Sequence, residues 1–507
     1  MWKYCYKGVG AGLSVLLLAG CEPNYSELDT PLEQVNYDKW TTHSRVVEFV
    51  EQLDAASDLM TLNYIGDSVE GRDIPYLQIS GDEEFGSDDD KLTLLIYGQQ
   101  HGNEPSGNDA ILDIMRNFAA GENLQWLDHM DILFVPQVNP DGAEVHQRRN
   151  ADDVDLNRSH LILNGKEVRH LRELFHQWEP EVALDVHEYQ PWVNSWLQHG
   201  YIRLFDEQYG LPTNLNVPEE IRSLAENEFL GYIEDHLQND GFTFHNYLVG
   251  NPESIRYSTS NINDGRQGMA ILNTFALILE GRRDREDDGN IAHRTAGQIS
   301  AIEGMLDFIV DYKNEISTAV NNSRQRLIDG EVEEFILTMG REKTGDPLTI
   351  PVLEVHETED GNYEKGDTIT VDIDDYYPLV VPERTTTLPA GYLVPAEEEE
   401  IIDLLRQHRV EYTELQGDEV IEAEQFRIDG FTEEVFESPT MIPTGSLEPT
   451  EYTAESGDIY VPVSQLRGLM IATALEAQSM HGYIQYNQFS HLKQEGEFPI
   501  LRVTSEL

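Results

Sequence analysis

The sequence predicts an α/β fold, with helices covering a sheet, followed by a smaller region of mixed but β-rich structure. Between about residues 43 and 315, short apolar runs alternate with stretches of helical periodicity, as expected for an α/β domain. Between residues 345 and 395 the chain becomes rich in Thr, Val, Asp and Pro, with many turn signals, which favours strands joined by turns. A chain of 507 residues, 39% of them hydrophobic, is long enough for two or three domains.

Individual elements of the fold can be assigned in order along the chain. Strand-like runs, each short and apolar, occupy residues 92–97, 131–138, 182–186 and 274–279. Helices are expected at residues 108–120 and 300–328. In the C-terminal part, residues 397–408 are helix-like, and the acidic run 397–400 is expected to lie at the positive N-terminal end of that helix.

The N-terminus carries the pattern of an export signal. Lys3 and Lys7 precede the apolar run 15–18, which ends in Leu-Ala-Gly followed by Cys21. This pattern resembles a bacterial lipoprotein signal peptide. The resemblance implies lipidation of Cys21 and anchoring to a membrane of the bacterial cell envelope, at the periplasmic face or the outer membrane.

These patterns divide the chain into four parts. We expect a signal peptide at residues 1–20, a polar tether at 21–42, an α/β domain at 43–330 and an accessory domain at 340–507. The accessory domain is expected to be a β-rich α+β structure, and its sequence assigns it no chemistry.

The charge balance excludes one class of partner. The chain has 94 acidic and 34 basic residues, and its formal net charge is −60. Such a surface repels phosphate backbones, so we expect no nucleic-acid partner. The acidity itself names no substrate, because excess surface carboxylates usually serve solubility.

Two strand ends carry residues suited to a metal. His101 and Glu104 lie three residues apart in the segment that follows the apolar run 92–97, and His187 directly follows the run 182–186. Imidazole nitrogens and a carboxylate suit Zn²⁺, and a catalytic zinc takes three protein ligands. Either Asp185 or Glu188 could orient a ligand from behind.

Further motifs lie between these ligand candidates. Residues 139–142 read Asn-Pro-Asp-Gly, and residues 155–158 read Asp-Leu-Asn-Arg; an Ile-Gly-Asp segment begins at residue 65. Together with the His-x-x-Glu motif, this ordered set resembles the zinc carboxypeptidases of the M14 type, the carboxypeptidase A-like peptidases. The resemblance covers about residues 40–290. It implies a mixed, mostly parallel sheet with helices on both faces, and one Zn²⁺ per chain.

The resemblance implies a role for each residue of the set. His101, Glu104 and His187 would hold the zinc. Asn157 and Arg158 would bind the terminal carboxylate of the substrate, a task that suits a planar guanidinium beside an amide.

The resemblance also implies three further residues at the reacting bond. Arg148, with Arg149 as its alternate, would steady the carbonyl oxygen. Glu280, which ends the apolar run 274–279, would be the general base, because burial raises the pKa of a carboxylate. Its alternative is a structural carboxylate paired with Arg282 or Arg283. Tyr257 matches a substrate-facing tyrosine by spacing alone, and a packing role is its alternative.

One segment and several competing functions complete the prediction. Residues 261–268 are expected to form a loop that could shape the specificity pocket. The leading function is a lipid-anchored zinc carboxypeptidase that hydrolyses peptide bonds and releases C-terminal residues. The alternatives are an amidohydrolase that resembles succinylglutamate desuccinylase or aspartoacylase, a peptidase acting on muropeptide stems of peptidoglycan, and a surface binding module with a decayed site.

Overall fold

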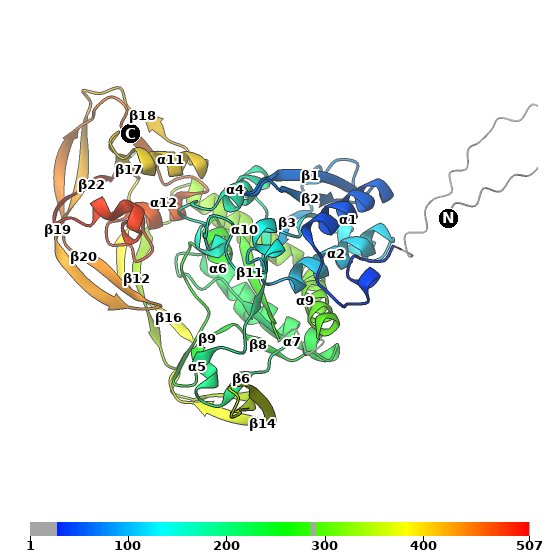
Figure 1. The fold of residues 1–507 in the computed structure, drawn as a ribbon. Coiled ribbons are helices and arrows are strands. Elements are labelled where there is room, and N and C mark those ends of the chain that lie inside the picture. The colour runs from blue at the N-terminus through cyan, green and yellow to red at the C-terminus, as the bar shows by residue number, and fades with distance from the viewer. Residues whose placement is uncertain (1–27, 285–289, 506) are drawn as a thin grey trace, which may run out of the picture.

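The computed structural model describes residues 28–284, 290–505 and 507 (Figure 1). The expected signal peptide at residues 1–20 and Cys21 lie outside the described residues. In the described part, no helix is both long and apolar enough to cross a membrane.

An eight-stranded sheet forms the centre of the α/β region. In spatial order its strands are β1 (Met60–Asp67), β2 (Asp73–Ile79), β4 (Met130–Val135), β3 (Leu92–Gly98), β5 (Val182–Tyr189), β11 (Phe275–Arg282), β7 (Glu207–Gly210) and β8 (Phe244–Asn246). The middle strands β4, β3, β5 and β11 run parallel. Strands β1 and β2 pair antiparallel with their neighbours, and β7 pairs antiparallel with β11 but parallel with β8. The predicted mixed, mostly parallel sheet is confirmed, and the four predicted strand runs fall within or overlap β3, β4, β5 and β11.

Helices cover both faces of this sheet. The main ones are α1 (His43–Ala56), α2 (Ser106–Ala119), α4 (Lys166–Trp178), α7 (Leu230–Asn239), α8 (Gly265–Ala270), α9 (Ile291–Asp311) and α10 (Lys313–Ile328). Successive side chains of a strand point to opposite faces. In β5, Val186 meets Gly107 of α2, whereas Asp185 meets Gly265 of α8. Helices α2 and α8 therefore lie on opposite faces of the sheet.

The C-terminal region is built mostly from strands. A six-stranded sheet contains β18 (Thr413–Glu414), β21 (Ile459–Pro462), β17 (Gly391–Val394), β22 (Gly496–Val503), β19 (Val420–Val435) and β20 (Pro439–Thr453), in that order. Helices α11 (Glu399–Gln407) and α12 (Gly468–Leu475) pack beside it. Strands β12 (Glu334–Glu342) and β16 (Leu379–Thr387) pair with each other, and in Figure 1 they link this sheet to the rest of the molecule. The β-rich C-terminal region is as predicted.

Hydrogen bonds join the two regions across the expected domain boundary. The hairpin of β13 (Leu348–Glu357) and β14 (Tyr363–Ile373) takes β6 (Tyr201–Arg203) of the α/β region as its third strand. Likewise, β15 (Tyr376–Tyr377) pairs with β10 (Ser254–Tyr257), which also pairs with β9 (Leu248–Asn251). The C-terminal region is thus attached to segments that come late in the α/β region.

The described part of the expected tether contacts the α/β region. Leu32 is buried, the ring of Trp40 lies 4.5 Å from the guanidinium carbon of Arg294, and Thr41 donates a hydrogen bond to Asp109 of α2. These contacts place residues 28–42 against helices α2 and α9.

Candidate active site

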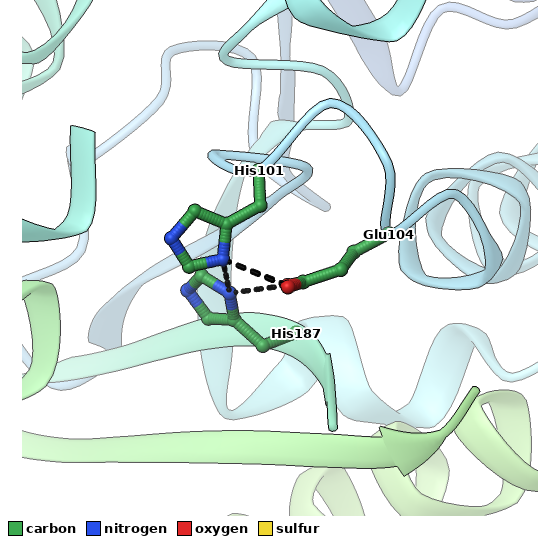
Figure 2. Close-up of side chains that lie close together, drawn as sticks. All are labelled: His101, Glu104 and His187. Atoms are coloured by element: carbon green, nitrogen blue, oxygen red, sulfur yellow. Dashed lines mark hydrogen bonds and ion pairs between the residues drawn. The ribbon is translucent and has the colours of Figure 1, made fainter. Parts of the chain in front are cut away.

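Three side chains converge at the ends of β3 and β5 (Figure 2). Nδ1 of His101 lies 2.9 Å from both carboxylate oxygens of Glu104. Nδ1 of His187 lies 2.8 Å from Oε2 of Glu104 and 3.0 Å from Nδ1 of His101. All three residues are buried, and their potential ligand atoms lie within 4.8 Å of one another. The structure brings together the three residues that the sequence predicted as metal ligands.

The alternation of strand β5 decides which acid orients His187. Asp185 and His187 are two residues apart and share a face, and Oδ1 of Asp185 lies 2.8 Å from Nε2 of His187. Glu188 points to the opposite face, where Arg294 of α9 donates to it from two nitrogens, at 2.9 and 2.6 Å. Asp185 therefore fixes the ring of His187 and leaves its Nδ1 facing the cluster.

A second carboxylate fixes the other imidazole. Oδ1 of Asp155, in the Asp-Leu-Asn-Arg motif, lies 3.2 Å from Nε2 of His101. Both histidines thus present Nδ1 to a common point and Nε2 to an aspartate, the arrangement that orients metal-binding histidines.

The electrostatics of the cluster keep its acid ionised. Burial by itself would raise the pKa of Glu104, but the charges and hydrogen bonds of His101 and His187 hold it well below its usual range. Burial would lower the pKa of His187, but Asp185 and Glu104 outweigh it and raise that pKa well above its usual value. Two imidazole nitrogens and a carboxylate directed at one point form a donor set that suits Zn²⁺.

The Asn-Pro-Asp-Gly motif braces the ligand loop. Asn139 caps the short helix α3 (Pro140–Glu144) by accepting from the Gly142 amide, and its side-chain amide donates to the carbonyl of Gln100 at 3.0 Å. A Cβ at Gly102 would lie 2.0 Å from the backbone of Gly142. Only glycine permits this close approach of the two loops, which explains why the two motifs occur together.

The cluster opens into a cavity of about 520 Å³. Its lining is polar and charged: it includes His101, Asn103, Glu104, Arg148, Asn157, Arg158, Glu188, Tyr189, Gln190, Tyr247, Thr259, Asp264, Ile278, Glu280 and Arg283. Most of the residues that the sequence predicted for the reaction line this cavity. His187 is not part of the lining but contacts His101 and Glu104. Tyr257 is also absent from the lining.

The structure separates Arg148 from its alternate. Nη1 of Arg148 lies 3.2 Å from Nδ1 of His101 and 3.5 Å from Glu104, and its Nε donates to Asp155 at 3.0 Å. Arg149 turns to solvent, where it pairs with Asp153. Of the two, Arg148 has its permanent positive charge beside the cluster.

Asn157 and Arg158 are held by the segment that precedes α8. The Gly265 amide donates to Oδ1 of Asn157 at 2.6 Å, and the side-chain amide of Asn263 donates to the carbonyl of Arg158. The Arg158 side chain is exposed to the cavity. Residues 261–268 were predicted to be one loop, but α8 begins at Gly265, where Asp264 caps it by accepting from the Gln267 amide.

Glu280 lies beside the ligands because of strand register. In the parallel pair β5–β11, Glu280 is opposite His187. Burial raises the pKa of Glu280 above its ordinary value, against the opposing charge of His187. Within the described residues, Arg282 pairs with Asp206 and Asp284 instead of Glu280.

Two tyrosines differ in their position relative to the cavity. The hydroxyl of Tyr257 accepts a hydrogen bond from the Leu211 amide at 3.1 Å, and the side chain packs against the core. Tyr247 lines the cavity together with Glu280. The spacing of residues predicted Tyr257 as the substrate-facing tyrosine, and no motif in the sequence indicated Tyr247.

Sequence reasoning also missed a buried line of hydrogen bonds behind His187. Nε2 of His160 lies 2.8 Å from Oε1 of Gln100, and Nε2 of Gln100 donates to both carboxylate oxygens of Asp185 at 2.9 Å. The line ends at His187. Gln100 directly precedes His101 in the sequence. This position beside the His-x-x-Glu motif was the one signal that could have indicated a supporting role for Gln100.

The donor set and the cavity together define a metallohydrolase centre. Comparison with known proteins shows a similarity in the α/β region. Residues 46–228 match the family model described as zinc carboxypeptidase, Peptidase_M14.

Relatives extend beyond this region. Carboxypeptidase 2 of Trichophyton tonsurans is 24% identical over 474 residues, covering 90% of this chain and 85% of the relative. Carboxypeptidase 2 of Trichophyton rubrum is 25% identical over 478 residues, with the same coverage. Among solved structures, carboxypeptidase A of Helicoverpa armigera is 15% identical and covers 59% of this chain and 78% of its own, with a TM-score of 0.44. Similarity to the fungal relatives therefore reaches into the C-terminal region.

Proposed function

We propose that this protein is a zinc carboxypeptidase that releases C-terminal residues from peptides at the cavity beside His101, Glu104 and His187. The observation that carries the proposal is the convergence of two imidazole nitrogens and a carboxylate at one wall of a polar cavity. The family match supports the same activity. When bound by these three residues, zinc supplies a Lewis acid that polarises a carbonyl and acidifies water.

The remaining residues have separate tasks in this proposal. Arg158, with Asn157 beside it, binds the terminal carboxylate through paired hydrogen bonds and so selects the free end of a chain. Arg148 faces the carbonyl oxygen of the scissile bond and stabilises the negative charge that develops there.

Glu280 is the general base of the proposed reaction. It accepts a proton from the attacking water and passes it to the leaving amine. Its raised pKa suits this task, because a carboxylate that is a stronger base takes the proton more readily. Tyr247 lines the same cavity, where its phenol faces the space in which the substrate would bind.

A substrate screen tests this function directly. Purified protein with zinc is assayed on matched peptides with free and with amidated C-termini, with N-acyl amino acids and with muropeptides. We expect release of the last residue from free ends only, and loss of this selectivity in Arg158→Gln. Equal cleavage of free and amidated peptides would contradict the role of Arg158. Exclusive cleavage of N-acyl amino acids would favour the amidohydrolase, and muropeptide cleavage alone would narrow the substrate to peptidoglycan.

Metal analysis of the same protein separates an enzyme from a binding module. We expect about one zinc per chain and loss of activity on chelation. Protein that binds no zinc and hydrolyses nothing would support a decayed site.

We also propose that the protein is anchored in the bacterial cell envelope through a lipid on Cys21. The support is the basic, apolar and small-residue pattern of residues 1–21. In a bacterial host, labelled fatty acid should be incorporated into the wild type but not into Cys21→Ser, and only the wild type should sediment with membranes. Equal membrane recovery of both forms would contradict the anchor.

A further inference from the structure

The C-terminal region reaches the wall of the active-site cavity. We call residues 257–265 the wall segment; two of its members, Thr259 and Asp264, line the cavity. Arg341 of β12 donates to the carbonyl of Tyr257 at 2.6 Å and to that of Ser258 at 3.2 Å. This arginine belongs to the C-terminal region, and its side chain is only 6% exposed.

A carboxylate from the same region completes the contact. Glu437, between β19 and β20, accepts from Arg341 at 3.0 Å and from the backbone amide of Ser260 at 2.6 Å. One carboxylate oxygen thus joins the arginine to the wall segment. Ser260 is fully buried, and its hydroxyl lies 3.3 Å from Nε2 of His481.

The wall segment in turn supports the residues proposed to bind the substrate carboxylate. Asn263 donates to the carbonyl of Arg158, and the Gly265 amide donates to Asn157. A displacement of the segment would therefore move Asn157 and Arg158, whereas the metal ligands lie on other loops, after β3 and in β5. A shift of about 1 Å in a positioning group is enough to weaken a reaction strongly.

We propose that Arg341 and Glu437 are positioning residues that hold the wall segment, so that the C-terminal region forms part of the substrate site. The inference rests on the proposed carboxypeptidase function. It assigns the region a role in substrate binding that is separate from metal binding and from the proton transfer by Glu280.

Glu437→Ala removes the bridge. Because the carboxylate anchor would be misplaced while the zinc site is intact, we expect KM for a free-ended peptide to rise about tenfold, with kcat changed by less than about twofold. Preference for free over amidated ends should fall, and zinc content should stay at the wild-type level. Glu437→Gln keeps an acceptor oxygen for Ser260 and Arg341. Its KM should therefore lie between that of the wild type and that of Glu437→Ala.

The matched control is Glu434→Ala. Glu434 lies in β19, three residues before Glu437, and pairs with Arg384 of β16 at 3.0 Å, away from the wall segment. This variant loses an Arg–Glu bridge of the same kind in the same hairpin. Its KM and end preference should match the wild type.

A second readout does not depend on activity. Amide hydrogen exchange of the wall segment should become faster in Glu437→Ala and stay unchanged in Glu434→Ala. An inactive wild type would refute the proposed function but leave this comparison intact.

Three results would overturn the proposal: wild-type KM and exchange in folded Glu437→Ala, equal effects in Glu437→Ala and Glu434→Ala, or altered zinc content as the source of the loss. If Glu437→Ala does not fold, Arg341→Lys serves instead. Lysine keeps the charge but cannot reproduce the forked donation of arginine, so wild-type KM in that variant also overturns the proposal.

Discussion

Buried histidines lie in two clusters that differ in their surroundings, and these surroundings shift the pKa values of His187 and His408 in opposite directions. At the active site, Asp185 and Glu104 raise the pKa of His187 well above its usual value. At the contact between α4 and the C-terminal region, burial together with Arg172 and Arg467 lowers the pKa of His408 to about 3. Burial alone does not decide the charge of a histidine; the charge of the neighbours decides whether the buried imidazole gains a proton or stays neutral.

The second cluster has a structural purpose. His408 donates from Nε2 to the carbonyl of Leu161 at 2.8 Å, and Arg467 donates to the carbonyl of His408 and to Glu179. Each partner comes from the α/β region or the C-terminal region, so the hydrogen bonds join the two. Variants at the first cluster should therefore change activity, whereas variants at the second should change stability.

Among the variants, substitution of Glu280 is expected to have the largest effect on kcat. Glu280→Gln should lower kcat about 10²- to 10⁴-fold, because the amide cannot accept the proton. Zinc content should be unchanged. The matched control is Glu207→Gln on the neighbouring strand β7, where burial raises the pKa of the carboxyl well above its usual range and the residue lies outside the cavity lining. Near wild-type hydrolysis by Glu280→Gln would rule out the proposed base.

Arg148 and Arg149 form a matched pair. Arg148→Gln should lower kcat/KM about 10²-fold, the typical cost of losing one group that stabilises a developing oxyanion. Arg149→Gln, which loses only an exposed pair with Asp153, should keep wild-type kinetics. Steady-state assays of the two variants side by side decide the assignment, and a larger loss in Arg149→Gln would reverse it.

The orientation of His187 can be tested through metal affinity. Asp185→Asn should weaken zinc binding about 10- to 100-fold, because the carboxylate that fixes the imidazole is lost. Competition with a chelator of known affinity measures this. If zinc affinity is unchanged, the support by Asp185 and by the Gln100 side chain behind it has no role in metal binding.

The smallest expected effect concerns how the free energy of unfolding depends on pH. His408 has its pKa lowered in the fold to about 3, whereas an unfolded histidine titrates near 6.5, so between these values the unfolded chain binds more protons. The stabilisation is complete above about pH 6.5 and is lost as the pH falls towards 3. This group alone should cost about 2 kcal/mol of unfolding free energy between pH 7 and pH 5.

Denaturant unfolding at the two pH values measures this cost. His408→Gln, which retains a donor for the carbonyl of Leu161, should lose less stability on acidification than the wild type. Identical pH dependence in both proteins would contradict the assignment. Activity at pH 7 should be unaffected, which separates this cluster from the active site.

The strands that carry the site could be predicted from sequence because they are short and apolar. Burial on both faces removes the alternation of polar residues, so each run stands out. His187 follows such a run directly, and His101 follows one after three intervening residues. Residues 261–268 were harder to assign. Their polar composition predicts a loop, but the Asp264 cap starts α8 inside it, and nothing in the residue order alone distinguishes a cap from a turn.

The sequence by itself indicated the candidate metal ligands, the resemblance to zinc carboxypeptidases and the mixed sheet, because these depend on residue types at short, ordered spacings. The tertiary structure decided which of several nearby candidate residues lies at the site. Strand alternation selected Asp185 over Glu188, and loop direction selected Arg148 over Arg149. Tyr247 came to the cavity wall in place of Tyr257. The contact of Glu437 with the wall segment also required the structure, since 177 residues separate Glu437 from Ser260 and only folding brings such distant positions together.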